Sequence, residues 1–129
     1  MKTLLALAIA VSVAGCGKAS AQQKLKDTSY CVGFYMAELE KPINQRNVAD
    51  IRKRYDLFVS LAMELLSKEG TVKTPSMVAL EADPDLRARL LQGKTDWQQV
   101  LDAKQDDRFP LMLKFTDECD KLQSEKIGK

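Results

Sequence analysis

Apolar side chains recur along most of this chain at the three- and four-residue spacing of amphipathic helices, and no alternating run is long enough to predict a strand. The first such segment after the N-terminal stretch covers residues 23–40. Its apolar stripe consists of Leu25, Thr28, Val32, Tyr35, Met36 and Leu39, with Cys31 at the edge. Pro42 disfavours helical backbone at Lys41, so we expect the helix to end there. Gly33 and Ala37 lie four residues apart on it and would let a neighbouring backbone approach closely.

The strongest helical pattern follows residue 47. Asn47 is the expected N-cap, Asp50 lies near the positive helix end, and Gly70 is the expected C′ residue. The main apolar face consists of Val48, Ile51, Tyr55, Phe58, Val59, Ala62, Leu65 and Leu66. Leu57 and Leu61 widen this face to more than half of the helix circumference. A helix that is apolar on so many sides belongs at the centre of a domain, in contact with several others.

Capping and turn residues divide the rest of the chain into shorter helices. Their predicted starts are Thr74-Pro75, Asp83-Pro84, Thr95 with Gln98 three residues later, and a position near Asp107. Gly93 is predicted to end the helix that begins at Asp83. Pro110 falls in a tolerated first turn of the last helix, whose apolar stripe includes Cys119. The pattern therefore predicts an all-α fold, a compact bundle of four to six helices.

The first 21 residues have the layout of a secretory signal peptide. Lys2 gives a positive start, and the apolar run over residues 3–13 is about half of the roughly 20 residues that a membrane span requires. The sequence VAGC at residues 13–16 resembles the lipobox of bacterial lipoproteins, in which the cysteine becomes the lipidated first residue. The sequence ASA at residues 19–21 is an alternative site for ordinary signal peptidase. Because the lipobox adjoins the apolar run directly, we favour lipidation at Cys16.

This interpretation assigns residues 1–21 to a signal peptide with its lipobox and tether, and residues 22–129 to a single all-α domain. The chain would reach the bacterial cell envelope and be anchored in the membrane through lipid on Cys16. Gly17 follows the cysteine where a retention signal for the inner membrane would have an aspartate, so we expect the periplasmic side of the outer membrane. Cleavage after Ala21 would instead give a soluble periplasmic or secreted protein.

The envelope compartment also determines how the cysteines are interpreted. Cys31 and Cys119 are the only pair with free thiols, whichever processing site is used. In an oxidising compartment such a pair normally forms a disulfide, which here would join the first helix to the last. The alternative is two buried thiols.

Charge and composition exclude several kinds of chemistry. Lys2 and Lys18 account for the whole net charge of +2, so the chain after residue 21 is neutral and lacks the basic excess of a nucleic-acid-binding protein. Histidine is absent, which removes the usual general base and the commonest metal ligand. The acidic residues Asp102, Asp106 and Asp107 lack the spacing of a calcium loop. We therefore expect no metal, no cofactor and no enzymatic activity.

These observations predict a non-catalytic module that binds another envelope protein or assists its assembly. The layout resembles that of small envelope proteins, including immunity and inhibitor proteins, but no motif selects among them. Leu57, Leu61 and Trp97 are the candidate partner surface, with core packing as the alternative for all three. Two other functions stay open at this point. A small apolar-ligand carrier would need an internal cavity, and an enzyme based on carboxylates would need acids that converge in a pocket.

Overall fold

The computed structural model describes residues 2–68 and 76–127, with the side chains of residues 21–45, 47–68 and 76–125. All the regular structure in these residues is helical, which confirms the predicted fold class. The elements are α1 (Lys2–Glu40), the 3₁₀ turn η1 (Gln45–Asn47), α2 (Val48–Lys68), α3 (Met77–Ala82), α4 (Pro84–Asp102) and α5 (Gln105–Ile127). No helix within the described part of the chain is long and apolar enough to cross a membrane.

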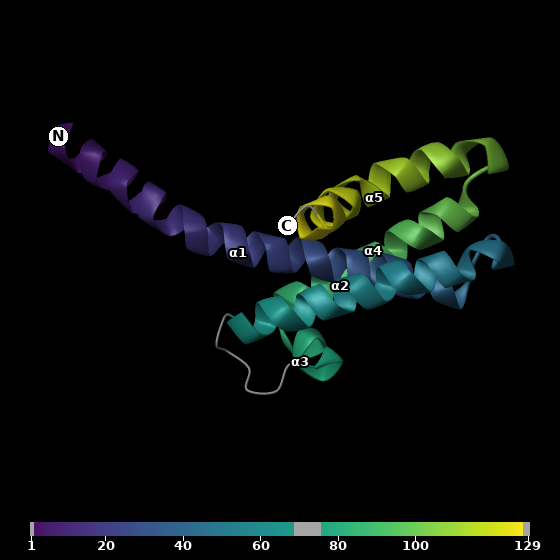
Figure 1. Ribbon diagram of the computed structural model, residues 1–129. Coiled ribbons are helices and arrows are strands. Elements are labelled where there is room, and N and C mark those ends of the chain that lie inside the picture. Colours follow the sequence, from purple (N-terminus) through teal and green to yellow (C-terminus); the bar gives the residue numbers. More distant parts are fainter. Residues whose placement is uncertain (1, 69–75, 128–129) are drawn as a thin grey trace.

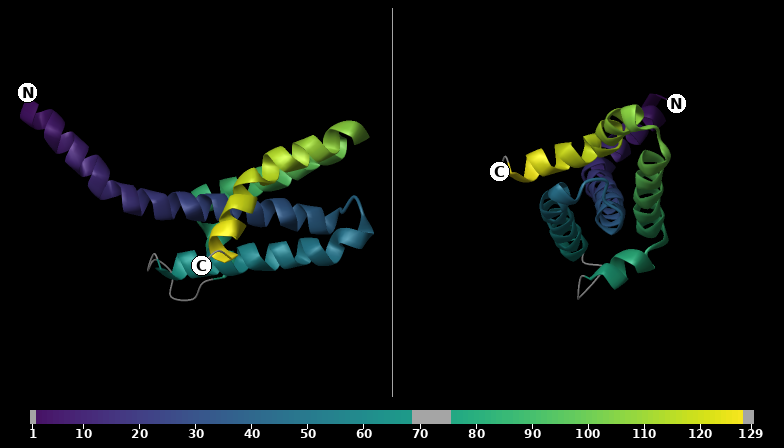
Figure 2. Two further views of the ribbon diagram at one scale, coloured as in Figure 1. Left: turned by 45° about the horizontal axis from the view of Figure 1, so that its top comes forward. Right: turned by 90° about the vertical axis from the view of Figure 1, so that its right-hand side faces the viewer.

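The first part of α1 extends away from the other helices, and the bundle forms around its second part (Figure 1). α1 packs mainly against α4 and α2, and α5 lies across them (Figure 2). The prediction that α2 is the central helix is therefore wrong, and α1 has that position. The physical reason is that residues 30–35 of α1 are all buried, so this part of the helix is covered on every side.

α1 and α4 cross at two glycines. A Cβ built on Gly33 would lie 1.9 Å from the carbonyl oxygen of Leu90, and one built on Gly93 would lie 2.2 Å from that of Tyr30. The close approach predicted for Gly33 is confirmed. Gly93, however, does not end a helix, because α4 continues through it to Asp102. Its lack of a side chain serves the crossing with α1.

The helix predicted to begin at Thr95 is also part of α4. The Thr95 hydroxyl donates a hydrogen bond to the carbonyl oxygen of Leu91, 3.0 Å away, which is a mid-helix contact and not a cap. The start at Asp83 is confirmed, since its carboxylate accepts hydrogen bonds from the backbone N–H groups of Asp85 (3.0 Å) and Leu86 (3.3 Å). Local capping signals therefore located one helix start correctly and suggested one that does not exist.

Other predicted ends agree to within a few residues. α1 ends at Glu40, α2 begins directly after Asn47, and α5 begins at Gln105, two residues before the predicted position. Ser76 is the N-cap of α3. The predicted start at Thr74-Pro75 and the predicted C′ residue Gly70 lie outside the described residues.

Cys31 and Cys119 are bonded, with an S–S distance of 2.09 Å and both side chains fully buried. The bond connects the second part of α1 to α5. It does not join the separate first helix over residues 23–40 that the pattern predicts, because α1 is continuous from Lys2 and crosses the predicted domain boundary at residue 21. Where the mature chain begins stays a prediction.

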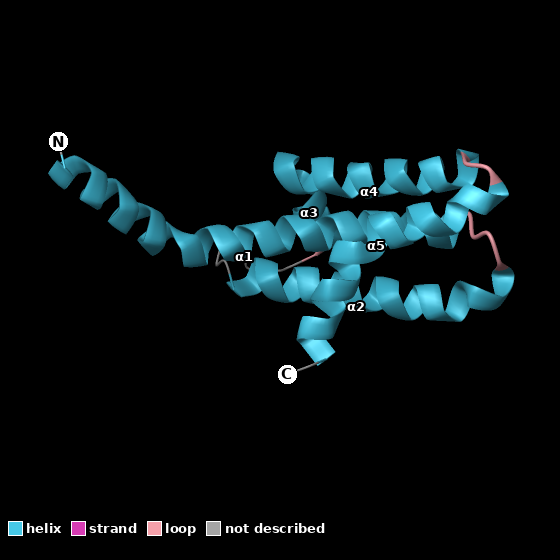
Figure 3. Ribbon diagram, turned by 90° about the horizontal axis from the view of Figure 1, so that it is seen from above, coloured by secondary structure: helices cyan, strands magenta, loops and turns pink. Residues whose placement is uncertain are grey.

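The core next to this bond is aromatic. The Phe34 ring meets Trp97 edge to face at 5.6 Å between centroids, and Tyr35 stacks on Phe58 at 5.5 Å. These four side chains are among the largest that are fully buried. The connections from α1 to α2 and from α4 to α5 both lie at the same end of the bundle (Figure 3). This end holds the candidate site.

Candidate functional site

The residues predicted as a partner surface lie inside the bundle or at its margin. Leu61 and Trp97 are buried, and Leu57 is half-buried. The indole N–H of Trp97 donates a hydrogen bond to the carbonyl oxygen of Lys41, 3.1 Å away, which ties α4 to the end of α1. The structure thus assigns Leu61 and Trp97 to the core, and neither is available as an exposed surface. The side chain of Cys16 is not among those described, so its lipidation stays a prediction.

The acidic residues considered for carboxylate chemistry do not converge. Asp102, Asp106 and Asp107 are all exposed, at the end of α4 and the start of α5. Within the residues that the structure describes, no three acidic, cysteine or histidine side chains are grouped so as to hold a metal ion. These three aspartates therefore do not form the pocket of converging acids that a carboxylate-based enzyme would need.

A cleft of about 320 Å³ lies between α1, α2 and α5. Tyr35 and Glu38 line it from α1, Arg54 from α2, and Phe109 and Leu113 from α5. These side chains meet because the last turns of α1, the first turns of α2 and the first half of α5 lie at the same end of the bundle (Figure 3). We call these five residues and their immediate neighbours the α1–α2–α5 cleft.

Two polar side chains of α1 are buried in this cleft. Tyr35 is 1% exposed, and its hydroxyl makes no hydrogen bond of regular geometry with the described residues, although the Arg54 guanidinium lies close enough to interact with it. Glu38 is 7% exposed and forms no ion pair with any described side chain. Buried polar groups normally have partners, and each exception calls for an explanation. A buried hydroxyl that lines a cleft without a regular hydrogen bond is a group available to a ligand.

Burial also changes the acid–base behaviour of both groups. Loss of solvation raises the pKa of Glu38 to about 7, although the positive charge of Arg54 acts in the opposite direction. Burial raises the pKa of Tyr35 to about 12, again opposed by Arg54. The guanidinium carbon of Arg54 lies 6.0 Å from the centroid of the Tyr35 ring. Glu38 therefore changes charge near neutral pH, while Tyr35 stays a neutral donor and acceptor.

The rim of the cleft is apolar on the α5 side. Phe109 and Leu113 stand one helical turn apart, and they are 67% and 53% exposed. A single large apolar side chain with this much exposure is common on protein surfaces. Here two such side chains lie side by side and adjoin a polar cleft. The arrangement offers contact area for a partner next to groups that can form hydrogen bonds and ion pairs.

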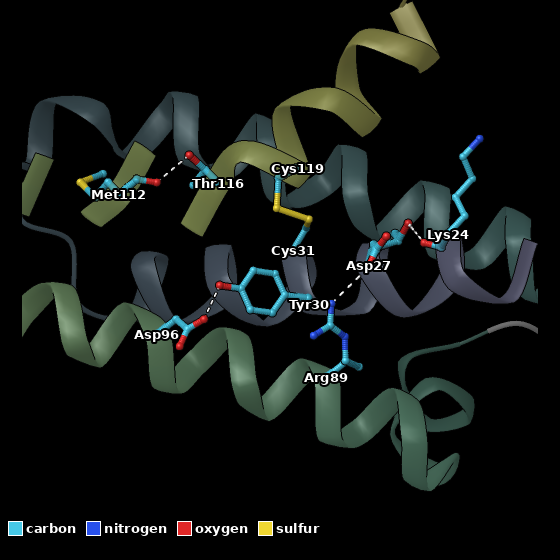
Figure 4. The surroundings of a disulfide bond; sticks show 10 residues. Lys24, Asp27, Tyr30, Cys31, Arg89, Asp96, Met112, Thr116 and Cys119 are labelled. Atoms are coloured by element: carbon cyan, nitrogen blue, oxygen red, sulfur yellow. Dashed lines mark hydrogen bonds and ion pairs between the residues drawn. A yellow bond between two sulfur atoms is a disulfide. The ribbon is translucent and has the colours of Figure 1, made fainter. Parts of the chain in front are cut away.

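A second polar group lies across the disulfide, between α1 and α4 (Figure 4). The Tyr30 hydroxyl donates a hydrogen bond to the buried carboxylate of Asp96, which also accepts one from Gln92 at 2.8 Å. Arg89 donates to the carboxylate of Asp27 at 3.1 Å and lies over the Tyr30 ring. A cleft of about 260 Å³ adjoins these residues.

These groups satisfy one another. Burial, followed by the hydrogen bond to Asp96, holds the pKa of Tyr30 well above its usual range, so the phenol stays protonated as a donor. A fully connected polar network between two helices fixes their packing and leaves no group for a ligand. The α1–α2–α5 cleft, with the buried Tyr35 hydroxyl, is therefore the better candidate site.

Sequence reasoning missed this site. It placed Tyr35 in an apolar stripe and gave Glu38 no role. One signal was present, since Glu38 is an acid between Ala37 and Leu39, in a segment that is apolar on most sides. The pattern could not show that α5 returns to the same end of the bundle and places Phe109 beside it.

Comparisons of this chain with protein-family models, with curated proteins and with solved structures found no match.

Proposed function

We propose that this protein is an exported protein of the bacterial envelope, anchored by lipid on Cys16, that acts as a non-catalytic module by protein–protein contact. In this role it resembles an immunity or inhibitor protein or an assembly factor. The observation that carries the proposal is the pair Phe109 and Leu113, which stand exposed on the rim of the α1–α2–α5 cleft. Aromatic side chains are enriched at protein interfaces, where they insert into a partner and supply much of the binding energy.

Residues 1–16 support the envelope assignment by their pattern of charge, apolar run and lipobox. Leu25, the first of the core residues on α1, lies nine positions after Cys16. As helix this spacer would measure about 14 Å, so lipid on Cys16 would hold the bundle close to the membrane surface. We propose the periplasmic side of the outer membrane as the location. A soluble periplasmic or secreted form that begins at Gln22 is the alternative.

A small-ligand carrier is the second candidate. The cleft volume of about 320 Å³ lies at the lower end of the range for ligand pockets. The lining favours a partner with polar groups over an apolar ligand, since Glu38, Asp50, Arg54 and Asp120 all contribute to it. Protein binding is therefore the function that we place first.

Site-specific photocrosslinking in living cells tests the proposal. A photoreactive phenylalanine analogue replaces Phe109 in one variant and Val78 in a control, because Val78 is 78% exposed on α3 and does not line the cleft. We expect one recurring crosslinked protein from position 109 and none from position 78. No product at 109, or the same products at both positions, would contradict a partner surface on α5.

Mass spectrometry of the mature protein tests the anchor. The proposal expects a first residue at Cys16 that carries acyl chains, and a Cys16→Ser variant that is no longer acylated. An unmodified chain that begins at Gln22 would contradict lipidation and leave the proposed protein contact unaffected.

A further inference from the structure

We propose that the α1–α2–α5 cleft receives a basic side chain, lysine or arginine, from a protein segment whose neighbouring apolar side chains rest on Phe109 and Leu113. The inference rests on the proposed function, because it names the chemistry of the partner. It follows from three features of the cleft: its charge, its buried hydroxyl and its apolar rim.

The charge of the lining favours a cation. Glu38, Asp50 and Asp120 contribute carboxyl groups from α1, α2 and α5. Arg54 is the one basic residue among the described side chains that line the cleft. Acidic groups therefore outnumber basic ones, so an incoming ammonium or guanidinium group is attracted and an incoming carboxylate is repelled.

The buried groups are suited to the same occupant. The Tyr35 hydroxyl makes no hydrogen bond of regular geometry with the described residues, although Arg54 interacts with it, and its oxygen can accept a hydrogen bond from an incoming ammonium or guanidinium group. Glu38 has no ion pair among these residues, and its burial penalises a lone negative charge. Arg54 offsets this penalty only in part, so a second cation in the cleft would favour the carboxylate form of Glu38 further.

The apolar rim determines what surrounds the cation. Phe109 and Leu113 lie on the exposed side of α5, where they can cover the apolar residues that flank a lysine or arginine in a polypeptide. The long methylene chains of these basic residues also pack well on apolar surface while their charged ends reach polar groups. A free metal ion or a simple ammonium ion would leave this rim unused.

Binding of three blocked tripeptides to the purified full-length protein tests the inference. The probes are N-acetyl Leu-Lys-Leu amide and the same peptide with glutamine or glutamate in the middle. Their binding is followed by amide chemical shifts in nuclear magnetic resonance spectra at pH 8. This method measures weak binding, with dissociation constants of about 1 mM. We expect the lysine peptide to shift the amides around Glu38 and Arg54.

The lysine peptide should bind up to about fivefold more tightly than the glutamine peptide, which is the upper end of what an exposed ion pair contributes, and the glutamate peptide should bind least. Glu38→Gln should remove most of this preference. Glu81→Gln should keep it, because Glu81 is exposed on α3 and does not line the cleft. Tyr35→Phe, which preserves the packing, should weaken the binding of the lysine peptide and leave the binding of the other two peptides unchanged.

Equal binding of the three peptides, tighter binding of the glutamate peptide, or no shift around the cleft would overturn the inference. Failure of the inference and failure of the proposed function give different results in the two experiments. A protein crosslinked from position 109 together with no lysine preference would contradict the inference only. A lysine preference that depends on Glu38, without any crosslinked protein, would contradict the proposed function only.

Discussion

Gly33 of α1 lies against the backbone of Leu90 of α4 so closely that a Cβ on Gly33 would stand 1.9 Å from the Leu90 carbonyl oxygen. In the same way, a Cβ on Gly93 of α4 would stand 2.2 Å from the carbonyl oxygen of Tyr30. Because the atoms in contact belong to the backbone, a rotamer change cannot relieve a clash. The two glycines therefore determine how close the central pair of helices approaches.

We expect Gly33→Ala to lower the free energy of unfolding by about 3 kcal/mol or more, since α1 and α4 must separate to admit the methyl group. Alanine has the higher helix propensity by about 1 kcal/mol, so propensity alone predicts the opposite sign. Urea denaturation followed by circular dichroism measures the difference. Ser60→Ala, at an exposed position of α2, is the control and should change stability by less than about 0.5 kcal/mol. A stabilised Gly33→Ala variant would show that the helices do not approach this closely.

Loss of the disulfide should release α5. The bond closes a loop with a sequence separation of 88, for which the chain-entropy relation gives about 4–5 kcal/mol as an upper figure. We expect the double variant Cys31→Ala/Cys119→Ala to be less stable than the native protein, and amide exchange to rise first in α5. A reducing agent should not change the unfolding of this variant further. Equal stability of the native and double-variant proteins would contradict the structural role of the bond.

Two tyrosines on α1 form a matched pair. The Tyr30 hydroxyl donates a hydrogen bond to buried Asp96, whereas the Tyr35 hydroxyl interacts with Arg54 but makes no hydrogen bond of regular geometry with the described residues. Tyr30→Phe should cost about 1.5–3 kcal/mol, because it removes a hydrogen bond to a charged group. Tyr35→Phe should change stability by less than about 1 kcal/mol, because it removes a buried hydroxyl that makes no hydrogen bond of regular geometry. Chemical denaturation of both variants measures the contrast, and equal losses would contradict this assignment of partners.

Glu38 should make stability fall as pH rises. Its pKa of about 7 in the folded protein lies above the ordinary value of 4.5, so the folded state holds the proton more tightly than the unfolded state. Below about pH 4.5 both states are protonated and no penalty arises. Between pH 4.5 and 7 only the unfolded chain releases the proton. Above pH 7 the penalty is complete, about 3–4 kcal/mol at most.

Urea denaturation of the native protein and of Glu38→Gln at pH 5 and pH 8 isolates this effect. Other titrating groups contribute equally to the stability of both proteins. The difference between the two pH profiles therefore measures the contribution of Glu38 to the pH dependence of stability. The substitution should raise stability at pH 8 relative to the native protein, and much less at pH 5. Glu81→Gln serves as the exposed control and should follow the native profile. Parallel profiles for the native protein and Glu38→Gln would mean that Glu38 is solvated.

Local patterns in the sequence determined the helical fold and several helix ends. The spacing of apolar residues and the capping of helix ends depend only on residues close together in the sequence. Pro42 therefore predicts the end of α1, and Asp83 the start of α4, without knowledge of the rest of the molecule. The pairing of Cys31 with Cys119 also followed from counting cysteines in an oxidising compartment. Leu61 and Trp97 lie on apolar helix faces, as the sequence pattern predicts. These faces belong to the core and do not form a surface for a partner.

Tertiary structure alone decided which helix is central and what the glycines do. Gly93 has the same local signature whether it ends a helix or allows a crossing, and the choice depends on Tyr30, more than sixty residues earlier in the chain. The cleft depends on long-range packing in the same way, because Glu38 and Phe109 come together only when α5 crosses α1. Burial then raises the pKa of Glu38 and leaves the Tyr35 hydroxyl without a hydrogen bond of regular geometry to the described residues. Desolvation is a property of the folded surroundings, and it gives these two ordinary side chains their chemistry.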